Sequence, residues 1–235
     1  MKTTILRSLF LLFSVSVLSQ AGHIMQGVGA VNMSMGGAAT AQPLDISGAL
    51  QWNPASISAF DDKIIKLDVG LFFSSPELSS SLPPNMLWQP GDFGPGVPGS
   101  PAVSGTTKDD RGTSLMPALA FLWGKEDSKH TFGASAFGIS GFGVTFPEEA
   151  NNPFSATFNP TVNSNPINYP QAAGGFGHIE SDYMLLQVGL SYAYEISDKF
   201  SIGIQPNIDY AALELAPNPI SSPSMYLGYP VSDKA

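Results

Sequence analysis

The sequence predicts an all-β protein, an antiparallel transmembrane β-barrel, and three observations support this prediction. Segments in which every second residue is apolar recur along the chain, as expected for strands with one apolar side. The longest such segment, 182–196, exceeds the five or six residues usual in soluble proteins and suits a tilted membrane strand of about 9–11 residues plus its ends. The connections between these segments alternate between long and short, which is typical of outer-membrane barrels.

The composition narrows the class of protein. Of the 235 residues, 43% are hydrophobic and only 12% are charged, against roughly 25% charged in an ordinary soluble domain. The 24 glycines and 20 prolines predict extensive turns. Cysteine is absent, which excludes disulfides and thiolate metal sites, and the net charge of −9 argues against a nucleic-acid partner.

Residues 1–21 have the layout of a secretory signal peptide. Lys2 and Arg7 form a basic start, an apolar core of about ten residues follows, and Ser19-Gln20-Ala21 offers small residues for cleavage. The apolar core is too short for a spanning helix. We expect the mature chain to begin at Gly22. Its net charge is two units more negative than that of the precursor, because Lys2 and Arg7 are lost.

The next segment, 22–62, follows neither a helical nor a strand period. It is rich in glycine and alanine, so it cannot bury a core of its own. We therefore expect it to pack inside or against a larger structure.

Five strands are predicted from the alternation of apolar and polar residues. They cover residues 63–73, 114–123, 131–146, 182–196 and 200–210. The third is interrupted by Gly138, Gly141 and Gly143, which predict a bend or bulge, because glycine weakens strand pairing. Close packing against segment 22–62 would also explain these glycines.

The connections predict the orientation of the barrel. Segments 74–113 and 147–181 are long and rich in proline, glycine and asparagine, whereas 124–130 and 197–199 are short. Outer-membrane barrels have long external loops and short periplasmic turns, so the N-terminus is expected on the periplasmic side. Aromatic residues near the short turns fit an interfacial girdle: Trp123, Tyr192, Tyr194 and Phe200. A secreted β-sandwich is the alternative, since its strands also alternate.

Several motifs resemble one family of membrane proteins. The stretch Gly29-Ala30-Val31-Asn32-Met33-Ser34-Met35-Gly36-Gly37-Ala38, followed by Trp52-Asn53-Pro54-Ala55, resembles the N-terminal hatch of FadL/TodX-type outer-membrane transporters. The third, fourth and fifth predicted strands also resemble the corresponding barrel strands of that family, in Phe132-Gly133-Ala134-Ser135, Ser140-Gly141-Phe142-Gly143, Leu190-Ser191-Tyr192-Ala193-Tyr194 and Phe200-Ser201-Ile202-Gly203.

The resemblance implies a barrel of about fourteen strands plugged by a hatch. Segment 22–62 would be the hatch, and 63–235 the N-terminal part of the barrel. The family carries long-chain fatty acids or aromatic hydrocarbons across the outer membrane by passive diffusion, with lateral exit at a kinked third strand. The implied site residues are the hatch motif Asn53, Pro54 and Ala55, the kink Ser140, Gly141, Phe142 and Gly143, and the pocket residues Gly22, His23, Ile24 and Met25.

The same resemblance sets the expected location and partners. We expect the outer membrane of a Gram-negative-type bacterium, a hydrophobic small-molecule ligand, surrounding lipid and lipopolysaccharide, and a monomer when complete. Five strands are fewer than the eight of the smallest such barrels, so we expect the natural protein to continue for about nine more.

Catalytic motifs are not recognised in the sequence. Gly138-Ile139-Ser140-Gly141-Phe142 lacks the second glycine of a nucleophile elbow, and the three histidines are scattered. Glu148 and Glu149 could bind a cation, but a solvated pair is the simpler interpretation. We expect no enzyme activity, cofactor or metal. The competing function is a structural or adhesive barrel that acts through its external loops.

Overall fold

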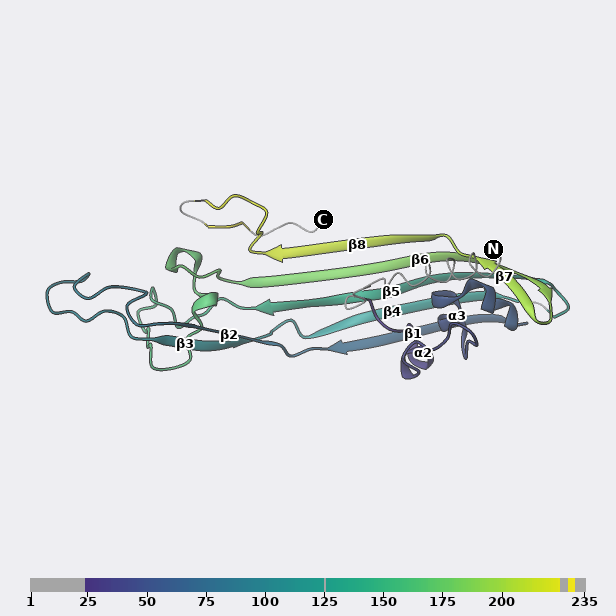
Figure 1. Cartoon of the computed structure of the whole chain (residues 1–235), viewed down its shortest axis with the longest axis horizontal. Helices are drawn as coiled ribbons and strands as arrows, with labels where there is room; N and C mark the ends of the chain where they lie inside the picture. Colours follow the sequence, from purple (N-terminus) through teal and green to yellow (C-terminus); the bar gives the residue numbers. More distant parts are fainter. Residues whose placement is uncertain (1–23, 125, 225–227, 231–235) are drawn as a thin grey trace, which may run out of the picture.

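The computed structural model describes residues 24–124, 126–224 and 228–230 and is an antiparallel all-β fold (Figure 1). The predicted signal peptide and the pocket residues Gly22 and His23 lie outside the described residues. Figure 1 shows the long strands side by side in one layer. The order of the large sheet is β1-β4-β5-β6-β7, and β8 also pairs with β6.

The strands of this sheet correspond to the five segments that alternate in sequence. Their bounds are β1 Lys63–Phe73, β4 Thr113–Trp123, β5 His130–Phe146, β6 Ile179–Ser197, β7 Phe200–Ile204 and β8 Asn207–Ala216. The fifth segment is divided into β7 and β8 at Gln205 and Pro206, where proline offers no amide hydrogen for a ladder. Both pieces pair with β6, so they continue one another along the same edge.

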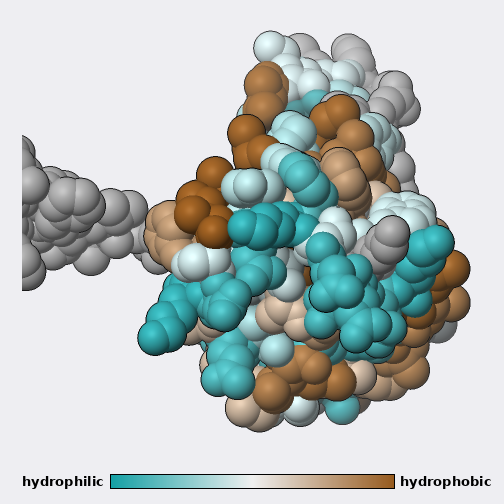
Figure 2. Space-filling model, turned by 90° about the vertical axis from the view of Figure 1, so that its right-hand side faces the viewer, coloured by the Kyte–Doolittle hydropathy of each residue, from teal (hydrophilic) through white to brown (hydrophobic). Residues whose placement is uncertain are grey.

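One face of the large sheet is apolar and exposed. On β1, Ile65, Leu67 and Val69 are 75%, 70% and 61% exposed, while Lys66 and Asp68 point to the opposite face. The register of the ladders places further exposed apolar side chains on the same face: Leu115, Trp123, Phe132, Met184, Val188, Leu190, Ile202, Ile204, Ile208 and Tyr210. Figure 2 views the end with the short turns, where hydrophilic residues gather and hydrophobic residues lie along the flanks.

The N-terminal segment, residues 24–62, packs against the opposite face of the sheet. It contains α2 Ala30–Ser34, α3 Ile46–Trp52 and the 3-10 helix η1 Pro54–Ala59. Its buried side chains form one core with inward side chains of the strands: Val28, Ile46, Ala49, Leu50 and Ile57 with Ala118, Ala120, Leu122, Phe137, Ile139 and Ala193. Burial of apolar area is the dominant force that holds such an irregular segment in place.

The predicted long loop 74–113 contains a hairpin that the sequence did not predict. Its strands are β2 Glu77–Leu82 and β3 Val103–Lys108, and they form a separate two-stranded sheet. Loop 147–178 includes η2 Pro166–Asn168 and η3 Gln171–Ala173 and docks against this hairpin. Tyr169 is buried in this loop. Burial raises the pKa of its hydroxyl above the ordinary value, and a hydrogen bond with Ser164 offsets only part of this rise.

The described helices are short. Among the residues that the structure describes, no helix has the length and hydrophobicity required of a transmembrane helix.

Candidate binding cavity

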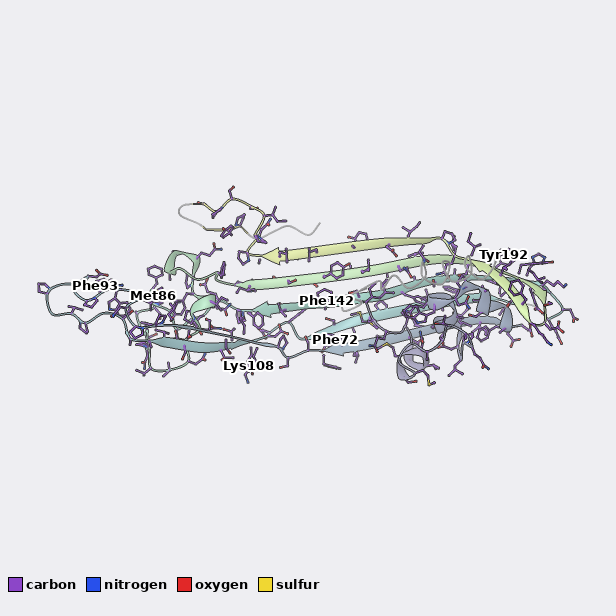
Figure 3. The ribbon with its side chains drawn as sticks, in the orientation of Figure 1. Phe72, Met86, Phe93, Lys108, Phe142 and Tyr192 are labelled. Carbon is purple, nitrogen blue, oxygen red and sulfur yellow. The ribbon has the colours of Figure 1, made fainter. Side chains whose placement is uncertain are left out.

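A cavity of about 530 Å³ lies between the N-terminal segment and strands β1, β4 and β5. Its size falls within the range of roughly 300–1,000 Å³ that is usual for small-molecule sites. Most of its lining is apolar, with contributions from Met25, Met33, Phe72, Met116 and Phe142. Figure 3 labels Phe72 on β1 and Phe142 on β5, the strands on either side of β4.

A β-bulge in β5 forms one wall of the cavity. Gly138 pairs with Leu186 and Ser140 pairs with Leu185, so Ile139 is an extra residue in β5. The carbonyl oxygen of Ile139 accepts a hydrogen bond of 2.8 Å from the amide of Met25. The bulge therefore leaves the Ile139 carbonyl oxygen available to the N-terminal segment. In a regular ladder, a neighbouring strand would bind such an oxygen.

The ladder between β4 and β5 covers only part of either strand. It runs from Trp123 and Phe132 to Ala118 and Phe137, although β4 begins at Thr113 and β5 continues to Phe146. The next residue on β4 is Pro117, which has no amide hydrogen to donate. Pairing between these strands therefore stops beside the bulge.

Met116 and Gly141 lie together where the two strands are no longer paired. A Cβ atom on Gly141 would lie 2.5 Å from Cε and 2.9 Å from Sδ of Met116. Gly141 also lines a second hollow of about 280 Å³, together with the exposed residues Leu115, Met184 and Tyr210. Gly141 thus borders both the inner cavity and a hollow on the exposed apolar face.

The structure brings two groups of predicted site residues together. Ile24 and Met25 line the cavity, and so do Ser140, Gly141 and Phe142 from the predicted kink. The register shift itself lies between Gly138 and Ser140, at the border of the predicted kink rather than within it.

Gly143, the last residue of the predicted kink, does not line the cavity. It pairs regularly with Asp182, and a Cβ atom on it would lie 2.1 Å from the carbonyl oxygen of Ser181. Close packing against Ser181 and Arg111 therefore accounts for this glycine, rather than packing against the N-terminal segment.

The predicted hatch motif lies away from the cavity, at the junction of α3 and η1. Asn53 accepts a hydrogen bond from the amide of Ala55 (3.1 Å) and donates one to the carbonyl of Thr40 (2.8 Å). The motif lies against β7, because a Cβ atom on Gly203 would lie 2.3 Å from the Ala55 nitrogen. Its hydrogen bonds thus lie within the N-terminal segment, and its contact with the sheet is close packing at Gly203.

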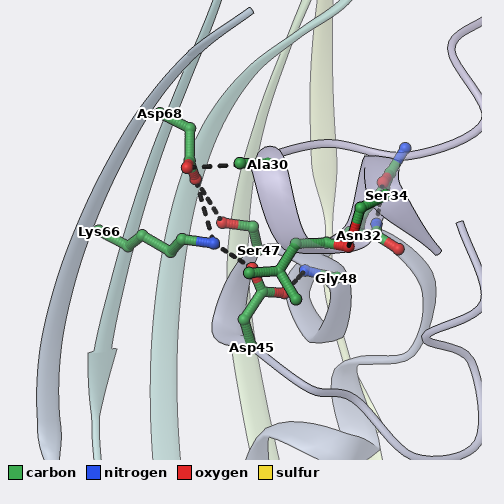
Figure 4. A network of polar contacts seen from close by, with 10 residues as sticks. Ala30, Asn32, Ser34, Asp45, Ser47, Gly48, Lys66 and Asp68 are labelled. Atoms are coloured by element: carbon green, nitrogen blue, oxygen red, sulfur yellow. Dashed lines mark hydrogen bonds and ion pairs between the residues drawn. The ribbon is translucent and has the colours of Figure 1, made fainter.

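A charged cluster joins the N-terminal segment to β1 beside the cavity (Figure 4). Lys66 forms ion pairs with Asp45 and, at 3.2 Å, with Asp68. Asp68 also accepts hydrogen bonds from the Ala30 amide (3.3 Å) and the Ser47 hydroxyl (3.4 Å). Two carboxylates and one ammonium leave the cluster with a net charge of −1, and Asp68 lines the cavity.

Sequence reasoning did not identify Met33, Asp68 and Met116 as cavity residues. Met33 lies in the segment without period, and the other two are inward positions on strands whose partners were unknown. Alternation reveals which face a residue occupies, but not what packs against that face.

Across residues 24–124, 126–224 and 228–230, no group of three His, Cys, Asp or Glu side chains could hold a metal ion.

Comparison with known proteins finds no match to a family model, to a curated protein or to a solved structure.

Proposed function

We propose that this chain supplies the hatch and part of the wall of an outer-membrane β-barrel that passes hydrophobic small molecules by diffusion. The observation that carries the proposal is the apolar cavity beside the β5 bulge, at the point where the β4–β5 ladder stops. In this proposal the N-terminal segment, residues 24–62, acts as the hatch.

The apolar face of the large sheet supports a membrane location. Exposed apolar side chains cover this face on β1, β4 and β6–β8, and water would make such a surface costly. Strands of 11 to 19 residues are long enough to cross a bilayer at a tilt. The long connections lie at one end of the sheet and the short turns at the other (Figure 1).

The proposed path leads from the inner cavity to the lipid. A ligand held against Met25 and Phe142 would pass between β4 and β5, where the strands have no ladder to break. It would displace the Met116 side chain and reach the hollow beside Leu115. Lateral exit lets an apolar solute reach lipid without crossing an aqueous pore, which favours this route.

Substitution of Met116 tests the proposal. In cells that produce the complete protein, Met116→Trp should reduce uptake of radiolabelled toluene by about fivefold or more, because indole fills the space beside Gly141. Leu67→Trp is the matched control, since Leu67 is exposed on β1 and lines neither the cavity nor the hollow. Folding is checked by heat-modifiable gel mobility. If cells with the unsubstituted protein take up no more toluene than cells without it, the proposed transport function is wrong.

A structural or adhesive barrel is the second candidate. The well-defined structure of the two long loops favours it. Hydrogen bonds from the buried Asn165 amide lock loop 147–178 to the β2–β3 hairpin. The tip beyond the hairpin carries Met86 and Phe93, 61% and 73% exposed (Figure 3). Deletion of residues 86–97 separates the candidates, because adhesion would be lost while toluene uptake would continue.

A further inference from the structure

We infer that the cavity selects uncharged ligands that carry a hydroxyl or carbonyl group, and that it discriminates against carboxylates. The inference rests on the proposed transport function and names the class of ligand. Two independent features of the cavity carry it, its charge and an unpartnered hydroxyl group.

The charge beside the cavity is negative. Among the described residues that line it, Asp68 is the one titratable side chain. The nearby cation, Lys66, already pairs with both Asp45 and Asp68, so the three groups sum to −1. An ionised carboxylate in the cavity would lose hydration and meet this negative cluster across an apolar medium, where repulsion is stronger than in water.

The hydroxyl group belongs to Ser140, which lines the cavity next to the bulge. Ser140 is 2% exposed, and its Oγ has no hydrogen-bond partner within the described part of the chain. A buried polar group without a partner is unfavourable, so a ligand that offers a hydroxyl or carbonyl oxygen gains a hydrogen bond there. A hydrocarbon of the same size gains none.

The remaining lining is adaptable. Met25, Met33 and Met116 supply flexible, polarisable side chains that accommodate apolar groups of different shapes. Selectivity therefore depends on the polar end of the ligand rather than on its apolar body. Long-chain alcohols, ketones and phenols have this chemistry.

Binding of three ligands with the same carbon number tests the inference. Radiolabelled 1-dodecanol, dodecanoate and dodecane are titrated at pH 7 into the complete protein in lipid nanodiscs, with empty nanodiscs as background. We expect 1-dodecanol to bind about tenfold or more tightly than dodecanoate.

Two variants separate the two features. Ser140→Ala should weaken 1-dodecanol binding by about three- to tenfold and leave dodecane unchanged, since one hydrogen bond is lost. Its matched control is Ser135→Ala, which removes another buried, unpartnered hydroxyl on β5 that does not line the cavity. Asp68→Asn should reduce the ratio of the affinity for 1-dodecanol to the affinity for dodecanoate. Asp209→Asn, on β8 and away from the cavity, should leave this ratio unchanged.

The outcomes distinguish this inference from the proposed function. Dodecanoate that binds the parent as tightly as 1-dodecanol would overturn the inference while transport stands, and so would equal 1-dodecanol affinity in Ser140→Ala and the parent. Failure of all three ligands to bind the parent would overturn both.

Discussion

At the scale of single residues, Asp45 links the N-terminal segment to the sheet through one carboxylate. One oxygen accepts the amide hydrogen of Gly48 at 2.9 Å and caps α3, and the other pairs with Lys66. A short helix of seven residues depends strongly on such a cap, because it has few internal hydrogen bonds.

Substitution of Asp45 should therefore destabilise the protein through two separate losses, the helix cap and the ion pair. Asp45→Ala loses the cap and the ion pair, and we predict a fall of about 1–3 kcal/mol in the free energy of unfolding. Asp45→Asn keeps an acceptor for Gly48 and should lose less. Urea denaturation in detergent measures both, with the exposed Asp62→Ala as control. An equal loss in Asp45→Ala and Asp62→Ala would contradict this role.

The two glycines after the bulge should respond differently to an added methyl group. In Gly141→Ala the new Cβ meets the flexible end of Met116, which can move, so we predict a loss of about 1 kcal/mol or less. In Gly143→Ala it meets the Ser181 carbonyl oxygen, which the ladder fixes, so the loss should be several times larger. Thermal unfolding in detergent compares them. Equal losses would show that Met116 cannot move.

At the scale of elements, the strands of the large sheet could be predicted because apolar residues alternate along the five segments that form them. Segment 182–196 becomes β6, Ile179–Ser197, and segment 63–73 matches β1. Alternation can be recognised in the sequence without knowing which strands are neighbours. It extends over the whole strand because one side faces lipid or a core along its full length.

The hairpin β2–β3 and the bulge could not be predicted in the same way. β2 is Glu-Leu-Ser-Ser-Ser-Leu, with little β-branched or aromatic character, and its partner begins some twenty residues later, at Val103. The glycines of β5 predicted an irregularity, but its position depends on the pairing of β5 with β6 and on Met25. Both depend on tertiary contacts.

The docking of the two long loops depends on Asn165. Its side chain is fully buried, donates to the Leu78 carbonyl (2.7 Å) and to the Thr107 hydroxyl (2.9 Å), and accepts from Ser80. Asn165→Ala leaves these half-buried groups without their partner, at a cost of about 1–3 kcal/mol each at most.

We predict that Asn165→Ala undocks the loops without unfolding the large sheet. Limited chymotrypsin digestion should cut within 147–178, after Phe154, Phe158 or Phe176, at least about tenfold faster, while the strands stay protected. Asn218→Ala, outside this network, is the matched control. Uniform acceleration across the whole chain would instead show that the loops and the sheet unfold together.

At the scale of the whole molecule, the described sheet is open. β1 pairs with β4 on one side, and β7 and β8 pair with β6 on the other, which leaves two edges. Backbone groups at an unpaired edge cannot be satisfied by lipid. A membrane location therefore requires closing strands, and these are part of the proposed barrel.

The central claim is that a hydrophobic ligand leaves between β4 and β5, and a removable cross-link tests it most directly. These 235 residues contain no cysteine, so Met116→Cys combined with Gly141→Cys introduces a single pair among them. A Cβ at 141 would lie 2.9 Å from Sδ of Met116, so the two positions lie against each other where β4 and β5 are unpaired. Leu119→Cys with Ala136→Cys is the matched control, because these residues are already partners in the ladder.

Uptake of radiolabelled toluene is then measured before and after reduction, with disulfide formation verified by mass spectrometry. We predict that the oxidised 116–141 pair reduces uptake by about tenfold or more, that reduction restores it, and that the 119–136 pair has no effect in either state. Unchanged uptake through a fully oxidised 116–141 pair would contradict lateral exit between β4 and β5.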